Sequence, residues 1–357
     1  MTAKPFHLGW FMSGFRVLGW QDTWIGTHAH DAMLADFYVD FARSLERACF
    51  DFFVSADSSY VPDAWQGSHD WYIRNAEAVP KYDPAVMMAI LSQSTSRLGI
   101  VPTLSVTEYP PYLLARLVST LDHVSRGRAG WNSVTSSSDR AAQNYGHPAQ
   151  PDHDRRYEMA NEYTDLVLQL WDSWEPEAML VDRDAGVFAD PSKVHTVDFH
   201  GEHYDCRGPI NTGRSPQGRP VVMQAGGSEK GRDYGSRYAD VILSSGMGVE
   251  GMKKYRDDVR ARVLAMGASP TNAKCSSSWL PYWATPRRRP GADGAACWPR
   301  RRRTPSAAWP RWAIRPTSTS RASTSTCPSG RSRRSSPPTG TRARWTRHRG
   351  QRRQDTA

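Results

Sequence analysis

Six short apolar runs constrain the fold of this chain more than any other feature. Each run is continuous rather than alternating, which is the pattern of a strand buried on both faces of a parallel sheet. We therefore predict six parallel strands. They cover residues 6–12, 52–56, 98–106, 129–134, 221–225 and 241–244.

Helical patterns fall between these runs. Apolar residues of 37–48 recur on one helical face, and Asp83 followed by Pro84 predicts an N-cap with proline at the first helical position, opening a helix that runs to Ser94. Strand and helix alternate, which predicts an α/β fold, and eight such units would close a (β/α)8 TIM barrel. Further helices are expected over 112–121, 157–174, from Ser228 onward, and over 251–266.

The stretch 175–218 interrupts this alternation, and we interpret it as an insertion between barrel elements. Its segment VHTVDFHGEHYDCRG predicts a β-hairpin that turns at Gly201. Three histidines lie in or beside the hairpin: His195, His200 and His203. No carboxylate and histidine pair at helical spacing accompanies them, so we predict no bound metal.

The composition changes abruptly after Lys274. Residues 275–357 hold 19 of the 46 Lys and Arg residues, all of them arginine, but only two of the 36 Asp and Glu residues. This segment has a net charge of +17, whereas residues 1–274 carry −7. Leu280 and Ile314 are its only Leu, Ile or Val residues. Such a segment cannot bury a core, so a disordered basic tail and an Arg-rich nucleic-acid-binding arm are both alternatives.

A change of reading frame explains more of the 275–357 segment. GC-rich genes read out of frame produce Arg, Pro, Ala, Ser and Trp in excess. With permissible choices of the wobble bases, reconstructed codons read one base earlier turn 275–291 into VLFLVATLLGDTAEEAR, the pattern of a buried strand, a turn and a helix start. Likewise, 317–330 become DIDFSRFDLDLPVG and 339–346 become NGHQGSLD. We predict a frameshift near Lys274, so that 1–274 form the barrel body and the last strands and helices are lost.

Localisation follows from what the sequence lacks. No apolar run approaches the roughly 20 residues that span a membrane, and the start MTAKPFHLGWFM does not have the layout of a signal peptide. The five cysteines have no CxxC spacing, which argues against a zinc site or a disulfide scaffold. We expect a cytoplasmic protein whose acidic body has neither a membrane nor a nucleic acid as partner.

Polar residues follow several of the predicted strands. Asp57, Thr103, Asn132 and Gln224 lie at or near strand ends, and Ser228 begins the helix after the fifth run. Barrel active sites lie at the carboxyl ends of the strands. Each residue alone could simply cap a strand end, but several around one rim favour a binding site.

Two segments could bind an anion. AGGSEKGR combines glycines, which allow close backbone approach, with a helix N-terminus that offers N–H groups to a phosphate; a tight strand-to-helix turn is the alternative. Histidines and arginines of the second segment, GHPAQPDHDRRYEMANEY, lie just before the 157–174 helix. They could bind a phosphate or a developing oxyanion; the alternative is a solvated segment that caps the helix. No GxSxG, HExxH or Walker A motif occurs.

Long ordered motifs carry a family resemblance. The motifs are SADSS, LDHVSRGRAGWNSVTS, NYGHPAQPDHDRRYEMANEY, LWDSWEPEA and RGPINTGRSPQGRPVVMQAGGSEKGR. They resemble the nitrilotriacetate, pristinamycin and dibenzothiophene-sulfone monooxygenases, a branch of the luciferase-like flavin superfamily. The frame-corrected segments DIDFSRFDLDLP and NGHQGSLD resemble the C-terminal part of the same family.

The resemblance implies a cytoplasmic TIM-barrel enzyme, usually a homodimer, that binds FMN non-covalently. A separate NAD(P)H-dependent flavin reductase supplies the reduced FMN. Reduced flavin and O2 form a C4a-(hydro)peroxide, which oxygenates a small organic substrate. A deazaflavin-dependent oxidoreductase of the same barrel superfamily is an alternative, but it would need a different cofactor pocket. An inactive fragment is another, because this chain lacks the last barrel strands.

By matched motif, the resemblance implies six cofactor-binding residues and assigns no catalytic residue. Asp57 and Thr103 would contact the flavin ring region, and Asn132 would be a further flavin contact. The rest of FMN would be contacted by His153, Tyr157 and Ser228, with Ser228 suited to the phosphate.

Overall fold

The fold is known from a computed structural model that describes residues 7–16, 31–244 and 248–267. The 275–357 segment lies outside these residues, and so do the predicted frameshift and the buried strand that the earlier reading frame would restore. The following description concerns the described residues only.

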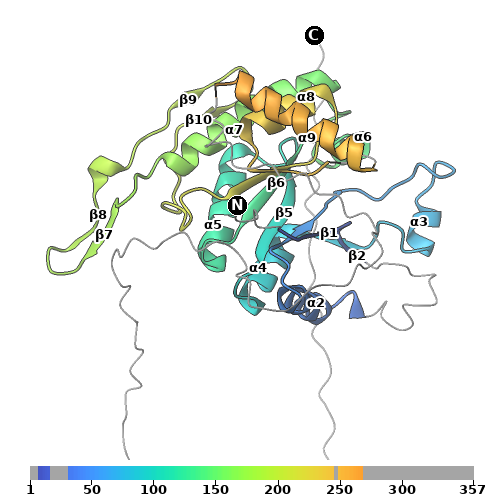
Figure 1. The fold of residues 1–357 in the computed structure, drawn as a ribbon, viewed down its shortest axis with the longest axis horizontal. Coiled ribbons are helices and arrows are strands. Elements are labelled where there is room, and N and C mark those ends of the chain that lie inside the picture. The colour runs from blue at the N-terminus through green and yellow to red at the C-terminus, as the bar shows by residue number, and fades with distance from the viewer. Residues whose placement is uncertain (1–6, 17–30, 245–247, 268–357) are drawn as a thin grey trace, which may run out of the picture. The chain divides into compact units, whose positions relative to one another are not determined.

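A six-stranded sheet forms the centre of the fold (Figure 1). All neighbouring strands pair in parallel, in the same order along the sheet as along the chain, which confirms the six predicted strands. This is the strand order that successive strand–helix units of a TIM barrel generate. The strands are β1 (Gly9–Met12), β3 (Phe52–Ser55), β5 (Gly99–Ser105), β6 (Gly130–Val134), β11 (Val221–Gln224) and β12 (Val241–Ile242).

Among the described residues, five longer helices connect the strands and a sixth, α9, follows β12; each matches a helix predicted from the sequence. At the start of α4, the Asp83 carboxylate accepts hydrogen bonds from the N–H groups of Ala85 (2.8 Å) and Val86 (3.1 Å), so the predicted N-cap is confirmed. The helices are α2 (Ala35–Arg47), α4 (Pro84–Ser94), α5 (Pro111–Ser125), α7 (His153–Asp172), α8 (Glu229–Tyr238) and α9 (Gly248–Ala265).

Two buried tryptophans join the sheet to its helices. Trp131 on β6 and Trp171 on α7 meet edge to face, with ring centroids 6.3 Å apart. Their indole N–H groups donate to the carbonyls of Leu104 (2.9 Å) and Ala115 (3.0 Å). A buried indole needs such a partner, because an unpaired N–H inside the core costs about 1–3 kcal/mol.

Short elements escaped the sequence patterns. The two-residue strands β2 (Phe15–Arg16) and β4 (Lys81–Tyr82) pair in antiparallel fashion, and α3 (Asp70–Arg74) and α6 (Asp139–Asn144) each make little more than one turn. Segments this short show no periodicity, so only the tertiary fold reveals them. β4 has a consequence for the site, because it carries Lys81.

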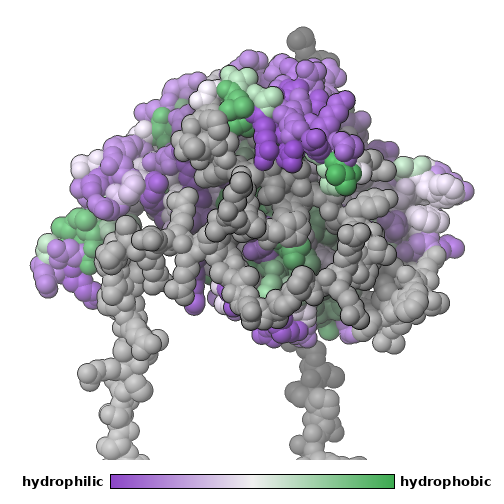
Figure 2. Space-filling model, viewed as in Figure 1, coloured by the Kyte–Doolittle hydropathy of each residue, from purple (hydrophilic) through white to green (hydrophobic). Residues whose placement is uncertain are grey.

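The predicted insertion is a set of small hairpins. β9 (Phe199–His200) and β10 (Asp205–Cys206) pair in antiparallel fashion around Gly201, whose N–H donates to the Tyr204 carbonyl (2.9 Å), as predicted. β7 (Met179–Asp182) and β8 (Val187–Ala189) form a second hairpin, with the short 3-10 turn η1 (Pro191–Lys193) after it. Figure 2 shows apolar side chains exposed over β7 and β8. Phe188 on β8 is 63% exposed.

Candidate functional site

Polar side chains gather at the carboxyl ends of β5, β6 and β11. A cavity of about 220 Å³ opens there. Its walls are residues 133–137, which end β6 and continue into the next loop, together with side chains from α7, β11 and α8: Tyr157, Gln224, Ala225 and Tyr234. The cavity therefore lies at the sheet edge where the sequence pattern predicts a binding site.

Thr103 and Asn132 are partners across this edge. The register of β5 and β6 places them opposite each other, and the Asn132 amide nitrogen donates to the Thr103 hydroxyl at 2.7 Å. Both side chains are buried, Asn132 being only 2% exposed. Its Oδ1 has no hydrogen-bond partner among the described residues. Buried acceptors are rarely left unpaired, so this oxygen marks a place where a ligand donor fits.

Gln224 repeats this situation on the neighbouring strand. It is the last residue of β11, it is 3% exposed, and its Oε1 likewise lacks a partner within the described part of the chain. Its amide nitrogen lies directly against Gly226, where any Cβ would collide with it. The neighbouring strands β6 and β11 thus each carry a buried amide with an unpaired oxygen.

Tyr157 and His153 approach the loop after β11 from the first turns of α7. The Tyr157 hydroxyl lies 3.0 Å and 2.8 Å from the positions that a Cβ would occupy on Gly226 and Gly231. Glycine at these positions therefore lets the phenol reach the loop. The His153 ring lies 5.1 Å from the Tyr157 ring, centroid to centroid, and its Nδ1 is 2.8 Å from the Asp154 carboxylate.

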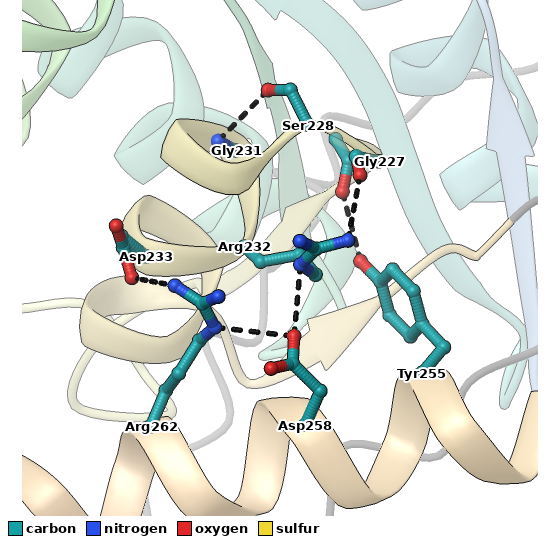
Figure 3. A network of polar contacts seen from close by, with 9 residues as sticks. Gly227, Ser228, Gly231, Arg232, Asp233, Tyr255, Asp258 and Arg262 are labelled. Atoms are coloured by element: carbon teal, nitrogen blue, oxygen red, sulfur yellow. Dashed lines mark hydrogen bonds and ion pairs between the residues drawn. The ribbon is translucent and has the colours of Figure 1, made fainter.

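Ser228 is the N-cap of α8, as predicted. Its hydroxyl accepts a hydrogen bond from the N–H of Gly231 at 3.1 Å. The loop before it, residues 225–227, is held by α8 and α9 through its carbonyls (Figure 3). A capped helix start with glycines before it offers backbone N–H groups to an anion.

Tyr234 closes the inner side of the cavity. Its hydroxyl hydrogen-bonds to Ser133 Oγ (2.6 Å) and Thr164 Oγ1 (2.7 Å). Burial raises the pKa of Tyr234 to about 12, so the phenol stays protonated at neutral pH.

Asp57 belongs to a second polar cluster at the same sheet edge. It follows β3, and burial raises the pKa of its carboxyl to about 6, against the opposing effects of the Ser58 N–H and the Lys81 ammonium group. Lys81 in turn donates to the Ser58 hydroxyl. The structure thus joins Thr103 to Asn132 and places His153, Tyr157 and Ser228 around one loop, whereas Asp57 has Lys81 and Glu108 as charged neighbours.

Glu108 connects the second cluster to the cavity. Its carboxylate accepts hydrogen bonds from Ser59 (2.8 Å) and from Ser136 (2.7 Å), so it ties together the loops after β3, β5 and β6. Ser136 lines the cavity and has a left-handed backbone conformation, with φ of 49°. Our sequence analysis missed Lys81, Glu108, Ser136 and Tyr234. The run of serines after β6 was a possible signal for Ser136, but no local pattern distinguishes the other three.

The described residues hold neither a cluster of metal ligands nor a helix fit to cross a membrane. Within them, no three His, Cys, Asp or Glu side chains converge as metal ligands do. The histidines of the insertion pair with carboxylates instead: His195 with Glu175 (2.6 Å) and His200 with Asp205 (2.9 Å). No described helix combines the length and the apolar character that a membrane crossing needs.

Sequence comparison assigns the chain to a family. The family model described as luciferase-like monooxygenase matches residues 16–296. A dibenzothiophene-sulfone monooxygenase of Rhodococcus erythropolis (strain XP) is 38% identical over 280 residues, which cover 78% of this chain and 62% of that protein. Component A of the nitrilotriacetate monooxygenase of Aminobacter aminovorans is 36% identical over 289 residues, covering 79% and 63%.

Solved structures agree with this assignment. The crystal structure of a long-chain alkane monooxygenase superposes with a TM-score of 0.71 at 33% identity, covering 76% of this chain and 63% of that one. A riboflavin lyase with modified FMN and riboflavin gives a TM-score of 0.69 at 35% identity, covering 74% and 60%. The chain spans about three-fifths of the length of these relatives. It belongs to the luciferase-like monooxygenase family.

Proposed function

We propose that this chain is the oxygenating component of a two-component monooxygenase that uses reduced FMN and O2 to oxidise a small organic substrate. The observation that carries the proposal is the pair of unpaired amide oxygens, Asn132 Oδ1 and Gln224 Oε1, on the adjacent strands β6 and β11. FMN has a ring N–H and several ribityl hydroxyls, which are the donors that these oxygens lack. An unpaired buried acceptor costs about 1–3 kcal/mol, and a bound donor would remove that cost.

The phosphate of FMN fits the start of α8. Ser228 caps this helix, and Gly226 and Gly227 bring the backbone close to any ligand there. Tyr157 and His153 complete the surroundings. The positive end of the helix dipole favours a dianion at this position.

Asp57 and Thr103 are proposed to hold the ring region. Thr103 fixes the orientation of the Asn132 amide, and Asp57 supplies a carboxyl that titrates near pH 6 beside Lys81. Bound reduced FMN would supply the electrons and the reaction with O2. The residues of this chain would orient the cofactor and keep water from the reacting centre.

The partner is proposed from the names of the relatives. One relative is component A of a monooxygenase, and others are subunits A and B of a pristinamycin IIA synthase. We propose that a separate NAD(P)H-dependent reductase delivers reduced FMN, and that the protein works as a cytoplasmic homodimer.

We also propose that the coding frame changes near Lys274. The support is the shift in charge and composition, together with the three protein-like segments that the earlier frame yields with permissible choices of the wobble bases. Resequencing the DNA across the Lys274 codon tests this directly. Because the last barrel strands would be out of frame, flavin binding and stability should be measured on both the 357-residue chain and the frame-restored chain.

Flavin titration tests the proposed function. We expect the frame-restored chain to bind FMN with micromolar or better affinity, and Tyr157→Ala and Ser228→Ala to weaken its binding about ten-fold each, since each removes a proposed phosphate contact. Ser138→Ala is the matched control, because Ser138 caps α6 in the same way as Ser228 caps α8. Unchanged affinity in both site variants would contradict the assignment of the phosphate site.

A further inference from the structure

The loop between β11 and α8 is held from outside the cavity by α9. Tyr255, Asp258 and Arg262 stand three and four residues apart, so they share one face of α9. Figure 3 shows this face turned toward α8 and the loop. We propose that these residues position the loop for the FMN phosphate, with Tyr255 as the principal positioning residue; this inference rests on the proposed function.

Two consecutive loop carbonyls are engaged by donors. The Tyr255 hydroxyl donates to the carbonyl of Gly226 at 2.8 Å, and Arg232 Nη1 donates to the carbonyl of Gly227 at 3.1 Å. In Figure 3 both donors lie between the loop and α9. The two carbonyls are therefore directed toward α9.

The direction of a carbonyl fixes the direction of the next N–H. In a planar trans peptide the C=O and N–H bonds point opposite ways. Holding the Gly226 carbonyl thus directs the N–H of Gly227 away from α9, and holding the Gly227 carbonyl does the same for Ser228. Successive N–H groups that face one side form an anion-binding concavity. Tyr255 and Arg232 consequently set the aim of the N–H groups that the phosphate would meet.

A charge network keeps Arg232 in place. Asp258 Oδ2 lies 2.8 Å from Arg232 Nε and 3.1 Å from Arg262 Nε, so one carboxylate bridges α8 and α9. Arg262 also pairs with Asp233 on α8. Linked ion pairs hold geometry better than isolated exposed pairs. Arg232 is thus prevented from turning away from the Gly227 carbonyl.

Tyr255 keeps its proton, as a donor must. Burial raises the pKa of its phenol, so the hydroxyl remains neutral across the working range of pH. Phenylalanine at this position would retain the ring and remove only the donor. The substitution Tyr255→Phe therefore isolates the contact to the Gly226 carbonyl.

A comparison of FMN with riboflavin separates positioning from general stability, because riboflavin lacks the phosphate. We would measure dissociation constants of both by flavin fluorescence. Tyr255→Phe and Asp258→Asn should each weaken FMN about five-fold and leave riboflavin unchanged. Tyr238→Phe is the matched control, since this hydroxyl donates to the Asn161 carbonyl on α7 instead.

Each outcome decides the inference. Loss of the preference for FMN over riboflavin in Tyr255→Phe and Asp258→Asn supports it. An unchanged preference in both variants overturns it, as does an equal loss of affinity for the two flavins. A wild-type chain that binds neither flavin, in either reading-frame background, overturns the proposed function and the inference with it. Circular dichroism of every variant confirms that the comparison is made on folded protein.

Discussion

Gln224→Met should stabilise the protein without ligand and weaken its binding of FMN. The side chain of Gln224 is 97% buried and its Oε1 lacks a hydrogen-bond partner, whereas methionine has nearly the same length and shape. Replacing an unpaired buried acceptor by an apolar group of similar shape removes a desolvation cost of about 1–3 kcal/mol. For a domain of this size, the melting temperature should rise by roughly 2–12 °C.

The same substitution removes a proposed acceptor for FMN. One hydrogen bond to a ligand contributes about 0.5–1.5 kcal/mol, so the dissociation constant should rise by roughly two- to ten-fold. Stability and affinity therefore change in opposite senses, which a substitution that merely disturbs packing would not produce.

The assay is thermal unfolding without flavin, followed by FMN titration of the same preparations. Gln169→Met is the matched control, because Gln169 is exposed on α7 and the same chemical change there should alter neither quantity. A Gln224→Met protein that melts lower than wild type, or that binds FMN equally well, would refute the reasoning that a ligand satisfies this buried amide.

Three further predictions follow from the structure. Burial raises the pKa of Asp57 to about 6, so the native state holds the carboxyl proton at pH values where the unfolded chain has lost it. The stability of the protein should therefore fall as pH rises from about 4 to 6. Asp57→Asn should raise the melting temperature at pH 8 but hardly at pH 4. Trp131→Phe should lower the free energy of unfolding by about 2–3 kcal/mol in urea titrations, since it leaves a cavity in the core and removes the hydrogen bond to the Leu104 carbonyl. Trp10→Phe is the control: this position is 40% exposed, so the substitution should lower the free energy of unfolding by less than about 1 kcal/mol. The frame-restored chain should unfold in one cooperative thermal transition and bind FMN. The 357-residue chain should do neither, because open sheet edges and uncovered apolar faces destabilise a barrel. Cooperative unfolding and FMN binding by the 357-residue chain would contradict the frameshift reasoning.

The sequence alone determined the architecture of the body. Parallel strands buried on both faces must be apolar throughout, so runs such as 98–106 and 221–225 were visible without any tertiary information. Caps were visible for the same local reason, because Asp83 and Ser228 bond to N–H groups only two or three residues further on. The sequence also placed Asn132 and Gln224 in the carboxyl-terminal halves of the predicted strands 129–134 and 221–225.

Only the tertiary structure decided which of these residues act together. Thr103 meets Asn132 through the register of β5 and β6, and Glu108 reaches Ser59 and Ser136 across loops that the sequence leaves unrelated. Tyr255 reaches the Gly226 carbonyl because α9 packs on α8, a contact between residues 29 positions apart. Local patterns record how each segment is buried and capped, but a contact between distant segments depends on the packing of the whole chain, which no local pattern encodes.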